Sequence, residues 1–143
     1  MVRKWNIPLT YQPKLAPVKR GECTQTIRII NKTKTHPEGV RKSVGDLIRF
    51  YTWMGKPYHS KRETITKYMK ITEAIPIKIF PTGILFVGDA MVPDVIRWGD
   101  LDWLAAKDSI VPPTGTELYN VLTSKNGKIP QEGVEAQIIR WGK

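Results

Sequence analysis

Residues 21–28 read Gly-Glu-Cys-Thr-Gln-Thr-Ile-Arg, and this stretch marks the point where a short helix ends and a strand begins. Upstream, Pro13 is placed to open a helix over residues 14–20, because proline fits the first turn of a helix. Gly21 is placed to end that helix, since glycine readily adopts the left-handed cap conformation. Downstream, residues 24–30 alternate in a β-rich composition and predict a strand.

The rest of the chain shows the same mixture of short strands and short helices. Period-2 alternation or β-rich composition predicts strands, and capping residues with an apolar stripe predict helices. The proline in the first predicted strand favours an edge position. The further strands are predicted over residues 7–11, 47–53, 65–80 (one long strand or a bent pair), 84–92 and 134–141, and the further helices over 101–107 and 114–125. We therefore expect one α+β domain spanning residues 1–143, with about six strands forming a small mixed β-barrel flanked by short helices.

Composition excludes several functional classes. The chain has one cysteine, Cys23, so it cannot form an internal disulfide, and its two histidines lack metal-ligand spacing. We expect no metal and no cofactor. No apolar run reaches the roughly 18 residues of a membrane helix, and the first residues contain no secretory apolar core. The expected location is cytoplasmic, with no membrane partner.

Positive charge is concentrated in the first half of the chain. The formal net charge is +10, and residues 1–80 hold 17 basic and 5 acidic residues, giving +12, while the remainder carries −2. Lysines and arginines that neutralise phosphates release counterions, so this asymmetry favours a polyanionic partner such as RNA. The alternative is a generally solvated basic surface.

Several segments, in their order along the chain, resemble the ASCH family of the PUA-like superfamily. A short helix ends in Gly-x-Cys-Thr-x-Thr-Ile-Arg, a Val-Gly-Asp turn opens a strand, and a basic segment follows. The resemblance continues near the C-terminus and covers the chain from about residue 7 to residue 141. The segments are residues 21–28, 44–46, 55–61, 105–110 and 135–141. The resemblance implies a PUA-like barrel that binds RNA or a nucleotide-derived ligand.

Two groups of residues are candidates for nucleic-acid binding. Thr24, Thr26 and Arg28 share one face of the strand predicted over residues 24–30, and hydroxyls with a guanidinium suit phosphates or base edges. The second group is in the basic segment and combines cations with an aromatic ring, a mixture on which single-stranded bases stack. Its members are Lys56, Tyr58, Ser60 and Lys61. The alternatives are an ordinary exposed β-strand face for the first group and a solvated turn for the second.

The resemblance also implies a hydrolase as an alternative function. Some ASCH-type proteins are amidohydrolases of acylated cytidines that use a lysine, a threonine nucleophile and an acid, and others are ribonucleases. By motif position the threonine is Thr26 and the acid is Asp108, but Cys23 stands in place of the family lysine. Cys23 itself is then either a nucleophile or a small apolar residue. A protein-interaction subunit, which would pair through the edge strand at residues 7–11, is the third interpretation.

Overall fold

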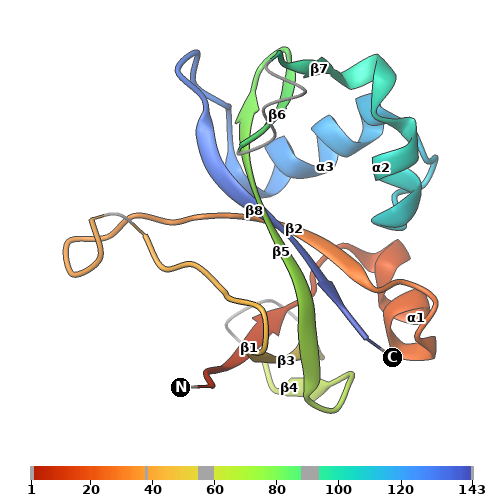
Figure 1. Ribbon diagram of the computed structural model, residues 1–143. Helices are drawn as coiled ribbons and strands as arrows, with labels where there is room; N and C mark the ends of the chain where they lie inside the picture. The colour runs from red at the N-terminus through yellow and green to blue at the C-terminus, as the bar shows by residue number, and fades with distance from the viewer. Residues whose placement is uncertain (1, 38, 55–59, 88–93, 143) are drawn as a thin grey trace.

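The computed structural model describes residues 2–37, 39–54, 60–87 and 94–142 (Figure 1). Three helices and eight strands make up the fold, so the predicted α+β class is confirmed. The strands are β1 (Lys4–Pro8), β2 (Gln25–Ile29), β3 (Leu47–Trp53), β4 (Arg62–Thr64), β5 (Met69–Phe80), β6 (Gly83–Phe86), β7 (Ile96–Arg97) and β8 (Val134–Trp141). The helices are α1 (Gln12–Arg20), α2 (Asp102–Lys107) and α3 (Gly115–Asn126), and a 3₁₀ turn, η1, spans Trp98–Asp100.

The long strand β5 joins the two halves of the sheet. Its first residues pair antiparallel with β3, and its last residues pair antiparallel with β6. Strand β8 runs antiparallel along β5 from Ile71 to Ile79, with a register shift between Ile71 and Glu73. Strand β2 pairs with the outer edge of β8, and β1 pairs in parallel with β3. Because β5 and β8 extend through both halves of the sheet, they connect the two ends of the fold.

The predicted closed barrel is wrong for the strands that the structure describes. Strand β1 pairs only with β3 and β2 only with β8, so these two strands are not joined by backbone hydrogen bonds. Pro8, at the end of β1, has no N–H to contribute to such a ladder. Instead, the guanidinium of Arg28 donates from Nη2 to the Pro8 carbonyl oxygen over 2.9 Å. We call this opening between the end of β1 and β2 the seam.

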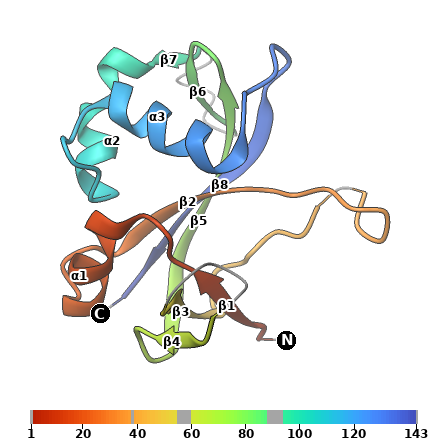
Figure 2. The same ribbon diagram turned by 180° about the vertical axis from the view of Figure 1, so that it is seen from behind.

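Two apolar clusters pack against opposite ends of the sheet. One lies under α2 and α3, and Leu104 and Leu118 are fully buried in it. The other lies under α1 and β1 and is centred on Phe50, whose ring centroid is 4.9 Å from that of Trp141. Figures 1 and 2 show α1 at one end of the sheet and α2 with α3 at the other. The seam opens between these two ends.

Local signals predicted the helices well. Helix α1 has Pro13 in its first turn and ends at Gly21, which has a φ of 78°. Helix α3 is capped by Thr114, whose hydroxyl accepts a hydrogen bond from the Glu117 N–H over 3.1 Å. The short elements β4, β7 and η1 had no sequence signal. The strand predicted over residues 65–80 begins only at Met69, and the end of the one predicted over 84–92 lies outside the described residues.

Residues 31–37 and 39–43 belong to the basic loop between β2 and β3, and Figures 1 and 2 show these parts of the loop projecting from the body of the molecule. Its two ends are fastened to β8. Lys32 and Arg41 both form ion pairs with Glu135, and the Gln137 amide exchanges two hydrogen bonds with the Lys42 backbone. Within the part of the chain described, no helix has the length and apolar character needed to cross a membrane.

Candidate functional site

A cavity of about 450 Å³ opens at the seam, and we call it the seam cavity. The chain after β1 forms one wall, β2 forms the opposite wall, and α1, α3 and the residue that ends α2 complete it. Its size is within the range of small-molecule sites. The lining residues are Pro8, Leu9, Thr10, Tyr11, Lys14, Thr26, Ile27, Arg28, Ile29, Asn31, Asp108, Ile110, Leu118, Val121, Leu122 and Asn126. The cavity therefore combines an apolar wall with a small group of charged and hydroxyl side chains.

A buried ion pair lies at the base of the seam cavity. Lys14 Nζ is 3.0 Å from Asp108 Oδ1, and the two side chains are only 4% and 8% exposed. Lys14 comes from the first turns of α1, where it shares the buried face with Val18 one turn later. Asp108 follows α2 directly, and its N–H bonds back to the Leu104 and Ala105 carbonyls. Two short helices thus hold the two charges in place.

The surroundings of Asp108 oppose its ionisation. Burial raises the pKa of the Asp108 carboxyl above its ordinary range, although Lys14, Arg28 and Gln25 all act in the opposite direction. The desolvation of a carboxylate is costly, and nearby cations with hydrogen bonds recover only part of that cost. The pKa of the Asp108 carboxyl is therefore set by a balance between its burial and the cations that lie near it.

Arg28 brings a second cation to the cavity. Arg28 is half-buried, its Nε is buried, and burial lowers the pKa of Arg28 to about 10 against the attraction of Asp108 and Tyr51. It therefore stays positive at neutral pH. One nitrogen donates to the Pro8 carbonyl, whereas the buried Nε has no hydrogen-bond partner among the described residues. A buried donor of this kind is costly to leave unpaired.

Thr26 and Asp108, the two residues assigned to hydrolysis, line the same cavity. Thr26 is 3% exposed and lies in β2 opposite Ile139 of β8. Thr24 does not join them. It precedes β2, accepts a hydrogen bond from the Trp141 N–H through its carbonyl, and borders a different hollow, beside Lys107. Of the first nucleic-acid-binding group, then, the seam cavity contains Thr26 and Arg28.

Cys23 does not line the seam cavity. Its side chain is 1% exposed and packs in the apolar cluster under α1. The thiol lies 3.4 Å from the Gln25 carbonyl oxygen and 3.7 Å from that of Lys107. Of its two interpretations, the structure supports the small apolar residue, because a nucleophile must reach a substrate.

The described members of the second predicted group, Ser60 and Lys61, do not line the seam cavity. Lys56 and Tyr58 are outside the described residues. Ser60 is half-buried, and Lys61 is exposed, with its carbonyl accepting from the Met54 N–H over 2.8 Å. This places both in the connection between β3 and β4, at the end of the molecule near α1 (Figure 1).

Sequence reasoning missed Lys14. Its signal was present, because Lys14 is four residues before the apolar Val18 on the predicted helix and so shares its face. A lysine at such a position is ordinarily expected to extend to solvent. The burial of Lys14 is explained by its ion pair with Asp108, which follows a helix far along the chain.

A larger hollow of about 860 Å³ adjoins the seam cavity and shares Ile29, Asn31 and Asn126 with it. The ionisable side chains around it, among them Lys128 and Glu132, are exposed or half-buried. The seam cavity is the stronger candidate because its charges are buried and fixed. Among the described residues there is no cluster of three side chains suited to a metal ion.

No protein-family model matches the chain, and comparison with curated proteins and with solved structures gives no match either. The resemblance to the ASCH family stays a prediction that depends on the order of short motifs. Function must therefore be argued from the seam cavity and the surfaces that adjoin it.

Proposed function

We propose that the chain is an RNA-binding domain of the PUA-like, ASCH type that takes one nucleotide of a single strand into the seam cavity. The observation that carries this proposal is Arg28, whose buried Nε has no hydrogen-bond partner among the described residues. An acceptor on a ligand, such as a phosphate oxygen or a base carbonyl, would satisfy that nitrogen. Arginine is well suited to both acceptors.

The other lining groups support a nucleotide rather than a simple anion. Lys14 and Arg28 outnumber Asp108, so the cavity carries a net positive charge that suits a phosphate. The Asp108 carboxylate can accept a hydrogen bond from an exocyclic amine, as carboxylates do from cytosine. Leu118 and Leu122 give an apolar surface for the base. The phosphate and the base of a nucleotide thus each have complementary groups in the cavity.

The test is a titration of the protein with cytidine monophosphate, comparing Arg28→Gln with Arg97→Gln. Arg97 is exposed on β7, so its variant removes the same charge far from the cavity. We expect Arg28→Gln to weaken binding about ten- to a hundredfold, the scale of hydrogen bonds to a charged group, and Arg97→Gln to leave it unchanged. Equal losses in both variants, or no binding by the wild type, would contradict the proposal.

A hydrolase of acylated cytidine is the second candidate, and one observation favours it. Lys14 brings an ammonium group to the cavity that holds Thr26 and Asp108, so a lysine is present although position 23 has none. In such a reaction the Thr26 oxygen would bond to the acyl carbon, Asp108 would take the hydroxyl proton, and Lys14 would stabilise the oxyanion. The amine would leave with a proton, and water would then release the acid.

This second candidate is tested with N4-acetylcytidine and three proteins: the wild type, Thr26→Ala and Thr26→Ser. The wild type would hydrolyse N4-acetylcytidine to cytidine and acetate. Thr26→Ser, which keeps a hydroxyl, would retain part of the rate. Thr26→Ala should abolish turnover while the protein stays folded by circular dichroism. If the wild type releases no cytidine, this second candidate is wrong.

A further inference from the structure

The solvent-facing side of β3 carries an unusual set of side chains. Ile48 and Phe50 point inward and are fully buried. The alternate residues Arg49, Tyr51 and Trp53 share the opposite side and are half-buried. The flanking strands add polar and aromatic neighbours. We call this surface the outer face, and its members are Lys4, Asn6, Arg49, Tyr51, Trp53, Arg62 and Tyr68.

Cations and rings alternate across the outer face. The Arg62 guanidinium carbon lies 4.6 Å from the Tyr51 ring centroid and 5.3 Å from that of Trp53. The Arg49 guanidinium carbon lies 4.5 Å from the centre of the Tyr68 ring, and Lys4 Nζ lies 5.4 Å from the same centre. Such contacts hold flat guanidinium and aromatic planes at the surface, and both kinds of plane stack with nucleic-acid bases.

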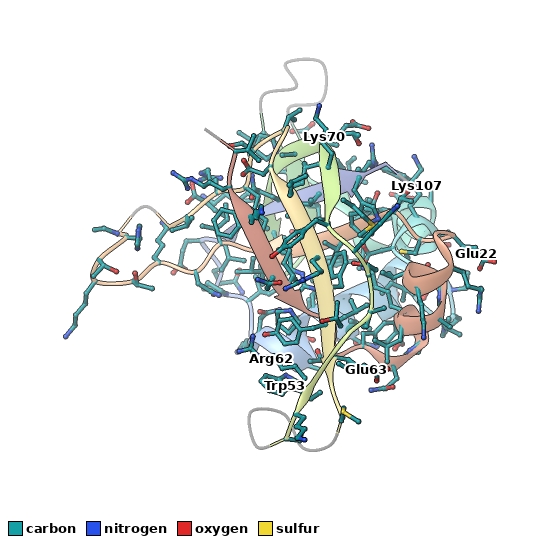
Figure 3. All side chains as sticks on the ribbon, turned by 90° about the horizontal axis from the view of Figure 1, so that it is seen from below. Glu22, Trp53, Arg62, Glu63, Lys70 and Lys107 are labelled. Carbon is teal, nitrogen blue, oxygen red and sulfur yellow. The ribbon has the colours of Figure 1, made fainter. Side chains whose placement is uncertain are left out.

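The charge of the outer face has one sign. Glu63 is the only acidic residue within β1, β3 and β4 as the structure describes them, and it borders a hollow beside Leu15 and Lys19 of α1. Figure 3 shows Trp53 and Arg62 together on one side of the β3 and β4 pair and Glu63 on the other. A partner seated here meets Lys4, Arg49 and Arg62 without a facing carboxylate from these strands. That pattern suits a polyanion with flat bases.

The outer face is continuous with the seam cavity. Pro8, which borders the cavity, is in register with Tyr51 of β3, and the Leu9 N–H bonds to the Tyr51 carbonyl oxygen over 2.8 Å. A strand with one nucleotide in the cavity therefore meets the outer face directly as it leaves.

We infer that the outer face is a second contact surface for single-stranded RNA, where the nucleotides flanking the one in the seam cavity stack on Trp53, Tyr68 and the guanidinium planes. This inference rests on the proposed function, because it extends the path of the same strand. The phosphates between the stacked bases would be neutralised by Lys4, Arg49 and Arg62. The cavity would then select one nucleotide, and the outer face would supply most of the affinity for the strand.

The experiment compares two ligands, an oligocytidylate of about ten nucleotides and cytidine monophosphate, for variants of the full chain. Trp53→Ala should weaken binding of the oligonucleotide about tenfold and leave binding of the mononucleotide unchanged. Trp53→Phe, which keeps a ring, should retain most of the affinity. The matched control is Trp103→Ala, because Trp103 is 45% exposed on α2 and stacks on Phe86, away from β3. Thermal melting checks that each variant folds.

The outcomes separate the two proposals. If Arg28→Gln weakens oligonucleotide binding but Trp53→Ala does not, the outer face is not a contact surface while the cavity site stands. If Trp53→Ala and Trp103→Ala weaken oligonucleotide binding equally, the outer face is likewise not a contact surface. If Trp53→Ala weakens binding and Arg28→Gln has no effect, the outer face is confirmed and the cavity assignment is wrong. If the wild type does not bind the oligonucleotide, both are wrong.

Discussion

Lys14 Nζ lies 3.0 Å from Asp108 Oδ1, and this contact joins α1 to the end of α2 across the seam cavity. Because both side chains are almost fully buried, each charge depends on the other for compensation. The pair fixes the positions of a cation and a carboxyl group that a ligand in the cavity would meet. It also predicts how stability responds to mutation.

Replacing Lys14 alone should be costly. In Lys14→Met the Asp108 carboxylate stays buried without its main partner, and we expect a loss of about 3–5 kcal/mol in the free energy of unfolding at neutral pH. The double variant Lys14→Met with Asp108→Leu should recover most of that loss, since it leaves no buried charge. Chemical denaturation measures both. As a control, Arg20→Ala breaks the exposed pair with Glu22 and should leave the free energy of unfolding unchanged. A double variant no more stable than Lys14→Met would contradict this account.

The raised pKa of Asp108 gives this effect a pH dependence. Between the ordinary aspartate pKa and the raised native value, the folded protein binds more protons than the unfolded chain, so the contribution of Asp108 to stability falls as pH rises. Loss of Lys14 removes a nearby positive charge, so it raises the pKa of Asp108 in the folded protein further and extends this pH range upward. The penalty of Lys14→Met should therefore shrink at acidic pH, where Asp108 is protonated. Unfolding curves of the wild type and Lys14→Met at a series of pH values would show this change. A loss in the free energy of unfolding that stays constant with pH would contradict the prediction.

Asp46 should behave in the opposite way. Burial opposes its ionisation, yet hydrogen bonds from the Trp5 indole and from the Ser43 and Arg3 N–H groups lower its pKa overall. A lowered pKa contributes stability that is present above the ordinary aspartate value and is lost as pH falls through the native value. Asp46→Asn should cost about 2 kcal/mol at neutral pH, the scale of hydrogen bonds to a charged acceptor. That difference from the wild type should disappear in acid, as followed by thermal melting.

Cys23→Lys, which introduces the lysine that the ASCH motif has at this position, should destabilise the protein rather than create activity. The thiol fills a buried apolar site, and the desolvation of an ammonium there would be costly. We expect a loss of several kcal/mol in the free energy of unfolding, whereas Cys23→Ala, which only removes volume, should cost less. A stable Cys23→Lys protein that hydrolyses N4-acetylcytidine would show that the side chain at position 23 can reach the seam cavity.

Salt should weaken RNA binding in proportion to the phosphates neutralised. Each contact with a single strand contributes about −0.7 to the slope of log K against log salt. Arg49→Gln with Arg62→Gln should therefore make the slope less negative by roughly 1.4, and Arg97→Gln should leave it unchanged. Fluorescence titrations of a labelled oligonucleotide at several salt concentrations give the slopes. A flat slope for the wild type would exclude a phosphate-dependent partner.

The sequence by itself determined the elements whose signals are local. Pro13 and Gly21 mark the two ends of α1, Thr114 caps α3, and the alternation of residues 47–53 defines β3. Each of these signals depends only on neighbours within a few residues. The concentration of basic charge in the first half is also readable without a structure. Motif positions further suggested that Thr26 and Asp108 belong together, and they do line one cavity.

Tertiary structure alone decided the open sheet and the contents of the seam cavity. Nothing near Lys14 in the sequence shows that Asp108 will compensate its charge, and nothing near Arg28 shows that its guanidinium will bridge to Pro8. Such contacts join residues far apart in the chain, so they depend on how β5 and β8 hold the two ends of the fold together. Burial of a charge is a property of the assembled molecule, because its cost and its compensation exist only once water has been excluded.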